Sequence, residues 1–396
     1  MADITAALEE FCRFSPGPSS RVRVFHAPGR VNLIGEHLDY NGGPVLPAAI
    51  SLGVWLFARE RRDGLSRFAS QAFPGVAETL VADVAPARRG DFADYPQGVY
   101  QTFGQQLGRP LPSLDLYYAG DLPSGAGLAS SAAVEVATAM ALDAFGGLGL
   151  SPRELAALAQ RAENDFVGVP CGIMDQFAVS LAQPGHAILL DTATLGYVHV
   201  PMRPGGLCFV IAHTGKAREL GGTKYHDRRR ECQEALALVQ TLNPGIRQLA
   251  DLAEGGDAVE RRLEDPVLRR RVHHVRTEAR RVYAAAAALR QGSGETFGEL
   301  MNQSHMSLRD DFEVTGVELD ALVEAAWGAE SCLGSRMTGA GFGGCTVSLV
   351  QRDALPEFFR QVTEGYSRAT GIVPTFHVTD LAAGAREVTE EVLAGL

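Results

Sequence analysis

One segment near the start of this chain, APGRVNLIGEHLDYNGG at Ala27–Gly43, constrains what the chain can be more than any other. Between its glycines lie four side chains suited to polar ligands: Arg30, Glu36, His37 and Asp39. A plain solvated turn rarely combines such groups, because small polar residues and glycine suffice for it. We therefore interpret the segment as part of a site for a polyhydroxylated ligand, with a surface turn as the simpler alternative.

Two strand-like runs flank this segment, RVRVFHA at Arg21–Ala27 and LGVWLFARE at Leu52–Glu60. Valine and aromatic residues in such runs are typical of β-strands. The polar residues are therefore expected in a loop between two strands, a common position for binding and catalytic groups.

A second glycine-rich segment, PSGAGLASSAA at Pro123–Ala133, follows a strand-like run at 114–119 and precedes a helical pattern. Gly125 and Gly127 let the backbone approach a ligand closely, and a helix beginning near Ser130 offers unpaired N–H groups. The chain has no GxxxxGK[ST] sequence, which excludes a Walker A loop. The segment predicts a phosphate-binding loop of another design, and a helix cap with structural serines is the alternative.

A third glycine-rich segment, MTGAGFGGCTVSLV, spaces Gly339, Gly341 and Gly344 as GxGxxG. In a dinucleotide-binding fingerprint such glycines follow a strand and open a helix. Here they precede the strand-like run at 345–350, so a Rossmann oxidoreductase is only the third functional alternative.

Two acidic residues outside these segments are candidate functional groups. Glu163 ends a helical pattern that starts at Ser151, Pro152 and Glu154 with the features of a capping box. It either faces the interior or is an ordinary exposed glutamate at a helix end. Asp175, in CGIMDQF, has apolar neighbours that would lower the local polarity, although an isolated aspartate of this kind is more often structural.

The composition excludes several classes of protein. With 396 residues, 46% of them hydrophobic and 21% charged, the chain is typical of soluble globular proteins with two or three domains. A net charge of −11 argues against a nonspecific nucleic-acid binder, and the basic run at 228–230 is expected to form ion pairs on a helix. The six cysteines show no metal-ligand spacing, and no leader or membrane span is evident, so a cytoplasmic protein with reduced thiols is expected.

Two domains are expected, at residues 1–205 and 206–396. The second would begin with the strand-like run at 207–213, followed by helical patterns at 225–242 and 257–291. The last stretch, FHVTDLAAGAREVTEEVLAGL, stays unassigned between the two domains.

Four segments together resemble the motifs of the galactokinases, which are members of the GHMP kinase superfamily. They are GRVNLIGEHLDYNGG, PxxxGLxSSxA at 123–133, GVPCGIMDQF at 168–177 and MTGAGFGGC at 337–345. One departure is Leu38, where galactokinases usually carry threonine and kinases of N-acetylgalactosamine an aliphatic residue. The resemblance implies an α+β, two-domain GHMP kinase fold, with an N-terminal α+β domain, a ferredoxin-like C-terminal α+β domain and the active site between them.

The resemblance also implies residue roles. Asp175 would be the catalytic base and Arg30 its partner, and the sugar would be bound by Glu36, His37, Asp39, Gly172 and Tyr225. ATP would lie on Gly125, Gly127, Leu128, Ser130 and Ser131, with Mg²⁺ held by Ser131 and Glu163.

The implied activity is ATP-dependent phosphorylation of the C1 hydroxyl of galactose, in galactose metabolism, by a monomer or weak homo-oligomer that binds neither nucleic acid nor membrane. Two rivals remain beside the oxidoreductase. One is a kinase for N-acetylgalactosamine, motivated by Leu38. The other is a catalytically silent sensor of sugar and ATP that regulates transcription. The intact Asp175, Arg30, Glu163 and Ser131 disfavour it, as does the lack of a DNA-binding motif in the sequence.

Overall fold

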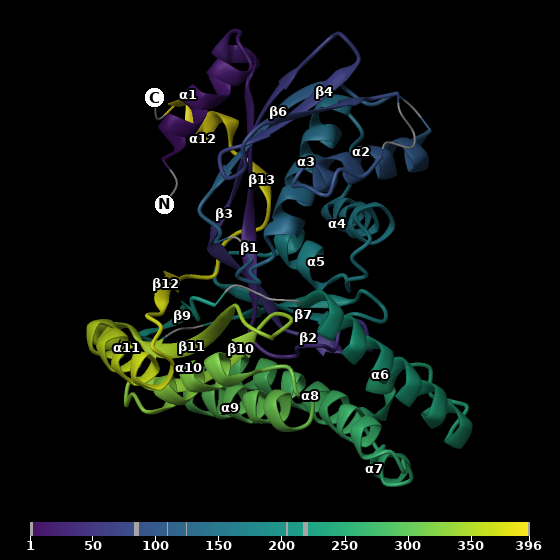
Figure 1. Ribbon diagram of the computed structural model, residues 1–396, viewed down its shortest axis with the longest axis vertical. Helices are drawn as coiled ribbons and strands as arrows, with labels where there is room; N and C mark the ends of the chain where they lie inside the picture. Colours follow the sequence, from purple (N-terminus) through teal and green to yellow (C-terminus); the bar gives the residue numbers. More distant parts are fainter. Residues whose placement is uncertain are drawn as a thin grey trace.

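The computed structural model describes residues 3–82, 87–108, 110–123, 125–202, 205–216 and 221–394. Two parts, each with its own sheet and helices, lie one above the other in Figure 1. A small sheet lies between them and contains β2 (Pro44–Val45), β7 (His186–Asp191) and β8 (Tyr197–Pro201). Within the described ranges, no helix is both long and apolar enough to span a membrane.

The upper part is built on a six-stranded sheet in the order β13-β1-β3-β6-β4-β5, in which only β4 and β6 are parallel neighbours. Helices α2 to α5 cover one face, and α1 and α12 lie on the other (Figure 1). The bounds of the strands are β1 (Arg23–Asn32), β3 (Pro47–Glu60), β4 (Leu65–Ser70), β5 (Val76–Leu80), β6 (Leu114–Gly120) and β13 (Arg386–Glu387). Those of the helices are α1 (Ile4–Phe14), α2 (Asp94–Leu107), α3 (Ser130–Gly146), α4 (Pro152–Arg161), α5 (Met174–Leu181) and α12 (Thr389–Ala394).

The lower part contains an antiparallel sheet in the order β10-β11-β9-β12. Its strands are β9 (Leu207–His213), β10 (Cys332–Thr338), β11 (Cys345–Gln351) and β12 (Thr375–Thr379). Its helices are α6 (Gly221–Leu242), α7 (Asp257–Glu260), α8 (Pro266–Gln291), α9 (Gly294–Asp310), α10 (Val317–Trp327) and α11 (Leu355–Thr370). This strand order confirms the predicted ferredoxin-like arrangement, and the loop after β10 leads into a strand, which contradicts the Rossmann alternative.

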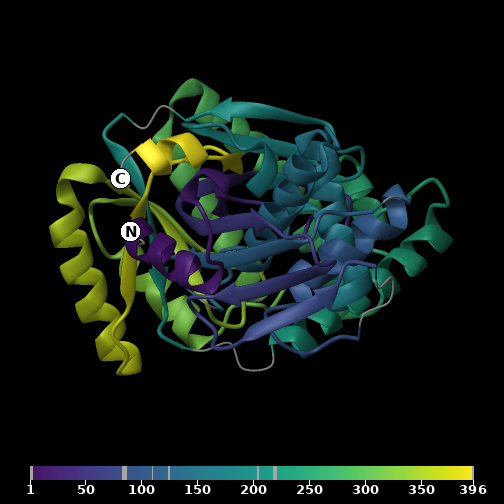
Figure 2. The ribbon, with the colours of Figure 1, turned by 90° about the horizontal axis from the view of Figure 1, so that it is seen from above.

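The end of the chain returns to the upper sheet. Leu381 forms a bridge with Ile50, β13 pairs with β1, and α12 packs against the apolar face of α1. Figures 1 and 2 accordingly show α1 and α12, the first and last helices, close together. The unassigned last stretch thus starts in the lower sheet and finishes on the upper one. The proposed boundary near residue 205 adjoins residues 203 and 204, which lie outside the described ranges, and stays a prediction.

The two parts share one continuous core. Leu33 and Ile34, which follow β1, belong to the same buried cluster as Val282 of α8 and Phe312 after α9. Burying these apolar side chains away from water is favourable, so they anchor the first motif between the two parts. This anchoring leaves the polar residues of the motif at the junction.

Among the element boundaries that differ from the expectation, two concern the first motif and the helical pattern at 257–291. Strand β1 continues to Asn32, so Arg30 lies on the strand and only Glu36, His37 and Asp39 lie in the loop that follows. The helical pattern at 257–291 is divided, because Asp265 caps a new helix by accepting from two backbone N–H groups while Pro266 takes its first position.

Candidate active site

A cavity of ≈ 530 Å³ lies where the two parts meet. It is lined by residues from α3, α5 and α6 and from the loops after β1 and β10. Every residue to which the sequence assigned a role is among them: Arg30, Glu36, His37, Asp39, Gly125, Gly127, Leu128, Ser130, Ser131, Glu163, Gly172, Asp175 and Tyr225. The structure therefore brings together groups up to about half the chain apart.

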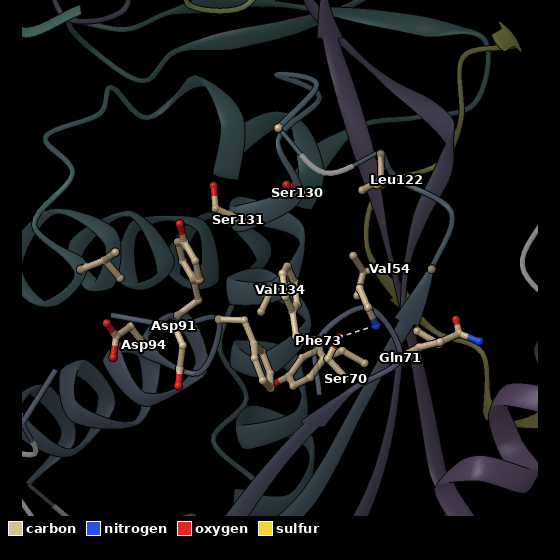
Figure 3. Close-up of a pocket in the computed structure, with 18 of the residues that line it drawn as sticks. Val54, Ser70, Gln71, Phe73, Asp91, Asp94, Leu122, Ser130, Ser131 and Val134 are labelled. Atoms are coloured by element: carbon tan, nitrogen blue, oxygen red, sulfur yellow. Dashed lines mark hydrogen bonds between the residues drawn. The ribbon is translucent and has the colours of Figure 1, made fainter. Parts of the chain in front are cut away.

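A second cavity, of ≈ 670 Å³, adjoins the first and is lined by apolar and aromatic side chains of the upper part, together with charged groups that include Asp91 and Asp94. Figure 3 shows Ser130 and Ser131 toward one end of it and Phe73 toward the other. The rings of Phe73 and Phe92 stack at 5.6 Å between centroids. Because Gly125, Ser130 and Ser131 line both cavities, a single elongated ligand can extend from one into the other.

Arg30 and Asp175 form a bidentate ion pair in the first cavity. Arg30 Nε donates to Asp175 Oδ1 and Nη2 donates to Oδ2, each at 2.7 Å, while Nη1 donates to the carbonyl of Gly127 at 2.6 Å. Gly29, beside Arg30, lets the loop come this close to β1, because a Cβ there would lie 2.8 Å from the carbonyl oxygen of Leu128. The glycine loop thus packs directly on β1, and Arg30 joins that loop to α5.

Glu163 lies beside this pair, in a π-helical turn (Ala162–Val167) that follows α4. Its Oε2 accepts from the buried amide of Gln176 at 2.6 Å, and the same amide donates to Glu135 at 3.1 Å. Burial and the charge of Asp175 raise the pKa of Glu163, whose side chain also lies within hydrogen-bonding reach of Ser131. The exposed helix-end alternative for Glu163 is therefore wrong.

These oxygen atoms fit a divalent cation. The described residues contain no group of three or more His, Cys, Asp or Glu side chains that could hold a metal alone. The hydroxyl of Ser131 and the carboxylate of Glu163 are, however, the hard donors that Mg²⁺ prefers, and a cation would offset the crowding of negative charge that raises the pKa of Glu163. Phosphates of a ligand and water would have to complete the coordination.

Asp39 also lines the cavity and lies against the backbone of Gly172. A Cβ at residue 172 would lie only 2.0 Å from Asp39 Oδ2, so only glycine allows this approach. Burial, together with the nearby charge of Asp175, raises the pKa of Asp39 to about 6. The ionised carboxylate is thus held in a poorly solvated position that favours accepting hydrogen bonds from a ligand.

Aromatic rings form the remaining wall. His37 Nδ1 lies 2.8 Å from Tyr40 Oη, and its ring lies 5.9 Å from that of Tyr225 on α6. Burial lowers the pKa of His37 well below its usual value, which keeps the ring neutral. Tyr40, inside the first motif, was missed as a lining residue although its position beside Asp39 could have indicated it.

Glu36 forms hydrogen bonds and an ion pair with residues of the lower part. Its Oε1 accepts from Thr338 Oγ1 at 3.2 Å and from the backbone N–H of Gly339 at 3.1 Å, and its Oε2 pairs with the fully buried Arg336. Glu36 therefore ties the first motif to the third glycine-rich loop, which contributes Gly339, Ala340 and Gly341 to the cavity. This connection between distant motifs had no signal in the spacing of the sequence.

Leu38 does not line the cavity. Its side chain is fully buried in the core cluster that also contains Val45 and Leu249. The departure from the usual threonine therefore changes core packing and leaves the cavity wall unchanged.

Comparisons with known proteins match this chain to the GHMP kinases, and to the galactokinases among them, along most of its length. A family model for the N-terminal domain of GHMP kinases matches residues 94–183, and one for their C-terminal domain matches residues 285–368. A model for the galactokinase galactose-binding signature matches residues 10–60. The galactokinase of Halalkalibacterium halodurans is 44% identical over 375 residues, which cover 94% of this chain and 95% of that protein. The galactokinase of Bacillus subtilis is 42% identical over 380 residues, with coverage of 95% and 97%.

Solved structures agree with these matches. Lactococcus lactis galactokinase complexed with galactose has a TM-score of 0.93 and 38% identity, covering 97% of this chain and 99% of that one. Methanococcus jannaschii mevalonate kinase has a TM-score of 0.67 at 17% identity, covering 91% and 98%, and shares the fold alone.

Proposed function

Because this chain belongs to the galactokinase family, we propose that it transfers the γ-phosphoryl group of ATP to the C1 hydroxyl of α-D-galactose, giving galactose 1-phosphate and ADP. The observation that best supports this proposal is the Arg30–Asp175 ion pair, located where the cavity lined by sugar-binding candidates meets the glycine loop. Phosphoryl transfer depends mainly on positioning and on neutralising charge, and this geometry supplies both.

Asp175 is the group that accepts or orients the proton of the attacking hydroxyl. Its two oxygens are fixed by Arg30, so the carboxylate has one orientation toward the cavity. Arg30 also lies against Gly127, and its positive charge can offset negative charge that develops on the transferred phosphoryl group.

The nucleotide is assigned to the second cavity and the glycine loop. The apolar walls and the stacked pair of Phe73 and Phe92 suit a planar base, and a volume of ≈ 670 Å³ is within the range of ligand pockets. The N-terminus of α3 at Ser130 and Ser131 suits phosphates, since its N–H groups are unpaired and the helix dipole is positive there. Mg²⁺, held by Ser131 and Glu163, would neutralise phosphate charge.

The sugar is assigned to Asp39, His37, Tyr225 and the backbone at Gly172. Glu36 would accept a hydrogen bond from a sugar hydroxyl through lone pairs that its contacts with the lower part leave free. Galactose is favoured over N-acetylgalactosamine as the substrate because Leu38 is buried away from the cavity. The silent-sensor alternative is disfavoured, since a protein that only senses ligands has no need of the fixed Arg30–Asp175 pair. A cytoplasmic location and a monomeric or weakly associating state stay predictions.

The test is ADP release from MgATP with galactose, N-acetylgalactosamine, glucose or no sugar. We expect galactose-dependent turnover that falls by roughly a hundred- to ten-thousandfold in Asp175→Asn, the usual loss when a general base is removed. The matched control is Asp165→Asn, because Asp165 is an exposed acid paired with Arg161. Preference for another sugar would replace galactose as the substrate, and no turnover with any sugar would contradict the kinase proposal.

A further inference from the structure

The basic run Arg228–Arg230 at the start of α6 divides into two kinds of arginine. Arg228 pairs with Glu231 at 2.8 Å, and Arg230 pairs with Asp227 at 2.9 Å. Both follow the intrahelical pattern that the sequence predicts. Arg229 does not, since no ion pair to a carboxylate is found for it in the described part of the chain.

Arg229 instead reaches from the lower part of the molecule to the upper part. Its Nη1 donates to the carbonyl oxygen of Pro170 at 2.6 Å, and its guanidinium carbon lies 5.9 Å from the ring centroid of Tyr40. A hydrogen bond from a charged donor is stronger than a neutral one, and a guanidinium over an aromatic face adds cation–π attraction. Arg229 is therefore held by Tyr40, which lines the first cavity, and by the carbonyl of Pro170, which does not.

The carbonyl that Arg229 holds belongs to the segment that supports Asp39. Pro170 is two residues before Gly172, whose backbone lies directly against the Asp39 carboxylate. On its other side the segment is fixed by Asn164, which accepts from the N–H of Cys171 at 2.8 Å, and by Gln160, which donates to the Cys171 carbonyl at 3.2 Å. Arg229 is the anchor supplied by the lower part of the molecule.

The same helix contributes to the cavity directly. Tyr225, one turn before Arg229, lies 5.6 Å from Tyr40 in an edge-to-face arrangement. One face of α6 thus presents Tyr225 to the cavity and Arg229 to the segment behind it. Any displacement of α6 from the upper part would separate both contacts at once.

We propose that Arg229 is a positioning residue for the sugar: it fixes the segment at 169–172 and the start of α6 around the galactose site, without contacting the reacting atoms. This inference rests on the proposed function, because it takes the first cavity to be the sugar site. It distinguishes Arg229 from its neighbours in the basic run. Arg228 pairs with Glu231 and donates to the carbonyls of Phe312 and Glu313, all in the lower part. Arg230 has a side chain that is 63% exposed.

The test compares Arg229→Met and Arg229→Lys with the control Arg230→Met, using calorimetric titration with galactose alone and, separately, with MgATP. Removing a charge-assisted hydrogen bond should weaken galactose binding by roughly tenfold in Arg229→Met, while MgATP binding stays unchanged. Arg229→Lys should fall between this variant and the wild type, since lysine keeps the charge but lacks the planar group. Arg230→Met should bind galactose as the wild type does.

The readouts separate the possible outcomes. Wild-type affinity for galactose in Arg229→Met would overturn the proposal, and so would an equal loss in Arg230→Met. Parallel losses for galactose and MgATP would also overturn it, because they would indicate a general effect on folding. If Arg229→Met does not fold, Arg229→Lys provides the same comparison. Failure of the wild type itself to bind galactose would contradict the proposed function, which the first titration reports independently of the variants.

Discussion

Arg30 binds Asp175 through two parallel hydrogen bonds of 2.7 Å and uses its remaining nitrogen to bind the carbonyl of Gly127. One side chain on β1 thus fixes the carboxylate on α5 relative to the glycine loop before α3. Such a forked contact restricts the carboxylate far more than a single ion pair does. The guanidinium of Arg30 therefore joins Asp175 to the glycine loop, which lines both cavities.

Arg30→Lys should lower kcat by about a hundredfold, because a lysine ammonium cannot form the planar two-bond contact that fixes Asp175. Galactose affinity should change little, since Asp39 and Tyr225 stay in place. Steady-state kinetics with galactose and with ATP, together with direct galactose titration, would check this. A lysine variant with wild-type kcat would contradict the role given to the bidentate pair.

Glu163→Gln should raise the Mg²⁺ concentration needed for half-maximal activity, because an amide oxygen is a weaker ligand than a carboxylate. The change should be about tenfold or more, and the KM for galactose should stay close to the wild-type value. Binding of Mn²⁺ in the presence of ADP, followed by paramagnetic resonance, gives a readout without turnover. Asp165→Asn, which alters an exposed acid two residues away, is the control. An unchanged metal response would exclude Glu163 as a ligand.

Local sequence patterns predicted the elements of the site well, because strand alternation and helix caps act over short distances. The capping box at Ser151 and Glu154 is present, and β6, α3 and β11 occur close to the expected residues. Every residue that was assigned a role lines the first cavity, and all of them except Glu163 and Tyr225 lie in the quoted motifs. Their proximity came from the family resemblance, since nothing in the spacing of residues 30, 163 and 175 implies that they meet.

Contacts between residues far apart in the chain could not be predicted from sequence patterns. The second cavity contains Phe73 and Phe92, which belong to no motif and become neighbours only when the sheet and α2 assemble. The pairing of Glu36 with Arg336 likewise joins two parts of the chain whose individual residues look ordinary. Arg229 was grouped with its neighbours because helical spacing could not indicate that it reaches Pro170.

Leu38→Thr should leave the preference between galactose and N-acetylgalactosamine unchanged within about twofold, because residue 38 is buried away from the cavity. The free energy of unfolding should fall by about 1–3 kcal/mol, since the smaller side chain leaves a void and buries a hydroxyl. The measurements are kcat/KM for both sugars and urea unfolding. A shift in sugar preference without a loss of stability would show instead that Leu38 influences the sugar site.

Galactose binding should weaken in acid because Asp39 must be ionised to accept hydrogen bonds from the sugar. Burial and the charge of Asp175 raise its pKa from the usual 3.8 to about 6 in the folded protein. Below that value Asp39 holds a proton, which the sugar must displace. The dissociation constant should therefore rise by about tenfold for each pH unit below the pKa and stay level well above it.

The same shift predicts a stability effect of known sign. Because the folded protein holds the Asp39 proton more tightly than the unfolded chain does, the contribution of Asp39 to stability falls as pH rises from its ordinary pKa of 3.8 to about 6. Asp39→Asn, which cannot ionise, should remove this decline and also flatten the pH dependence of galactose binding, at much lower affinity. Calorimetric titration between about pH 5 and 8 would measure the effect on binding, and urea unfolding between about pH 3.5 and 7, which spans both pKa values, would measure the effect on stability. If the variant keeps the acid-induced loss of binding, a group other than Asp39 must be responsible.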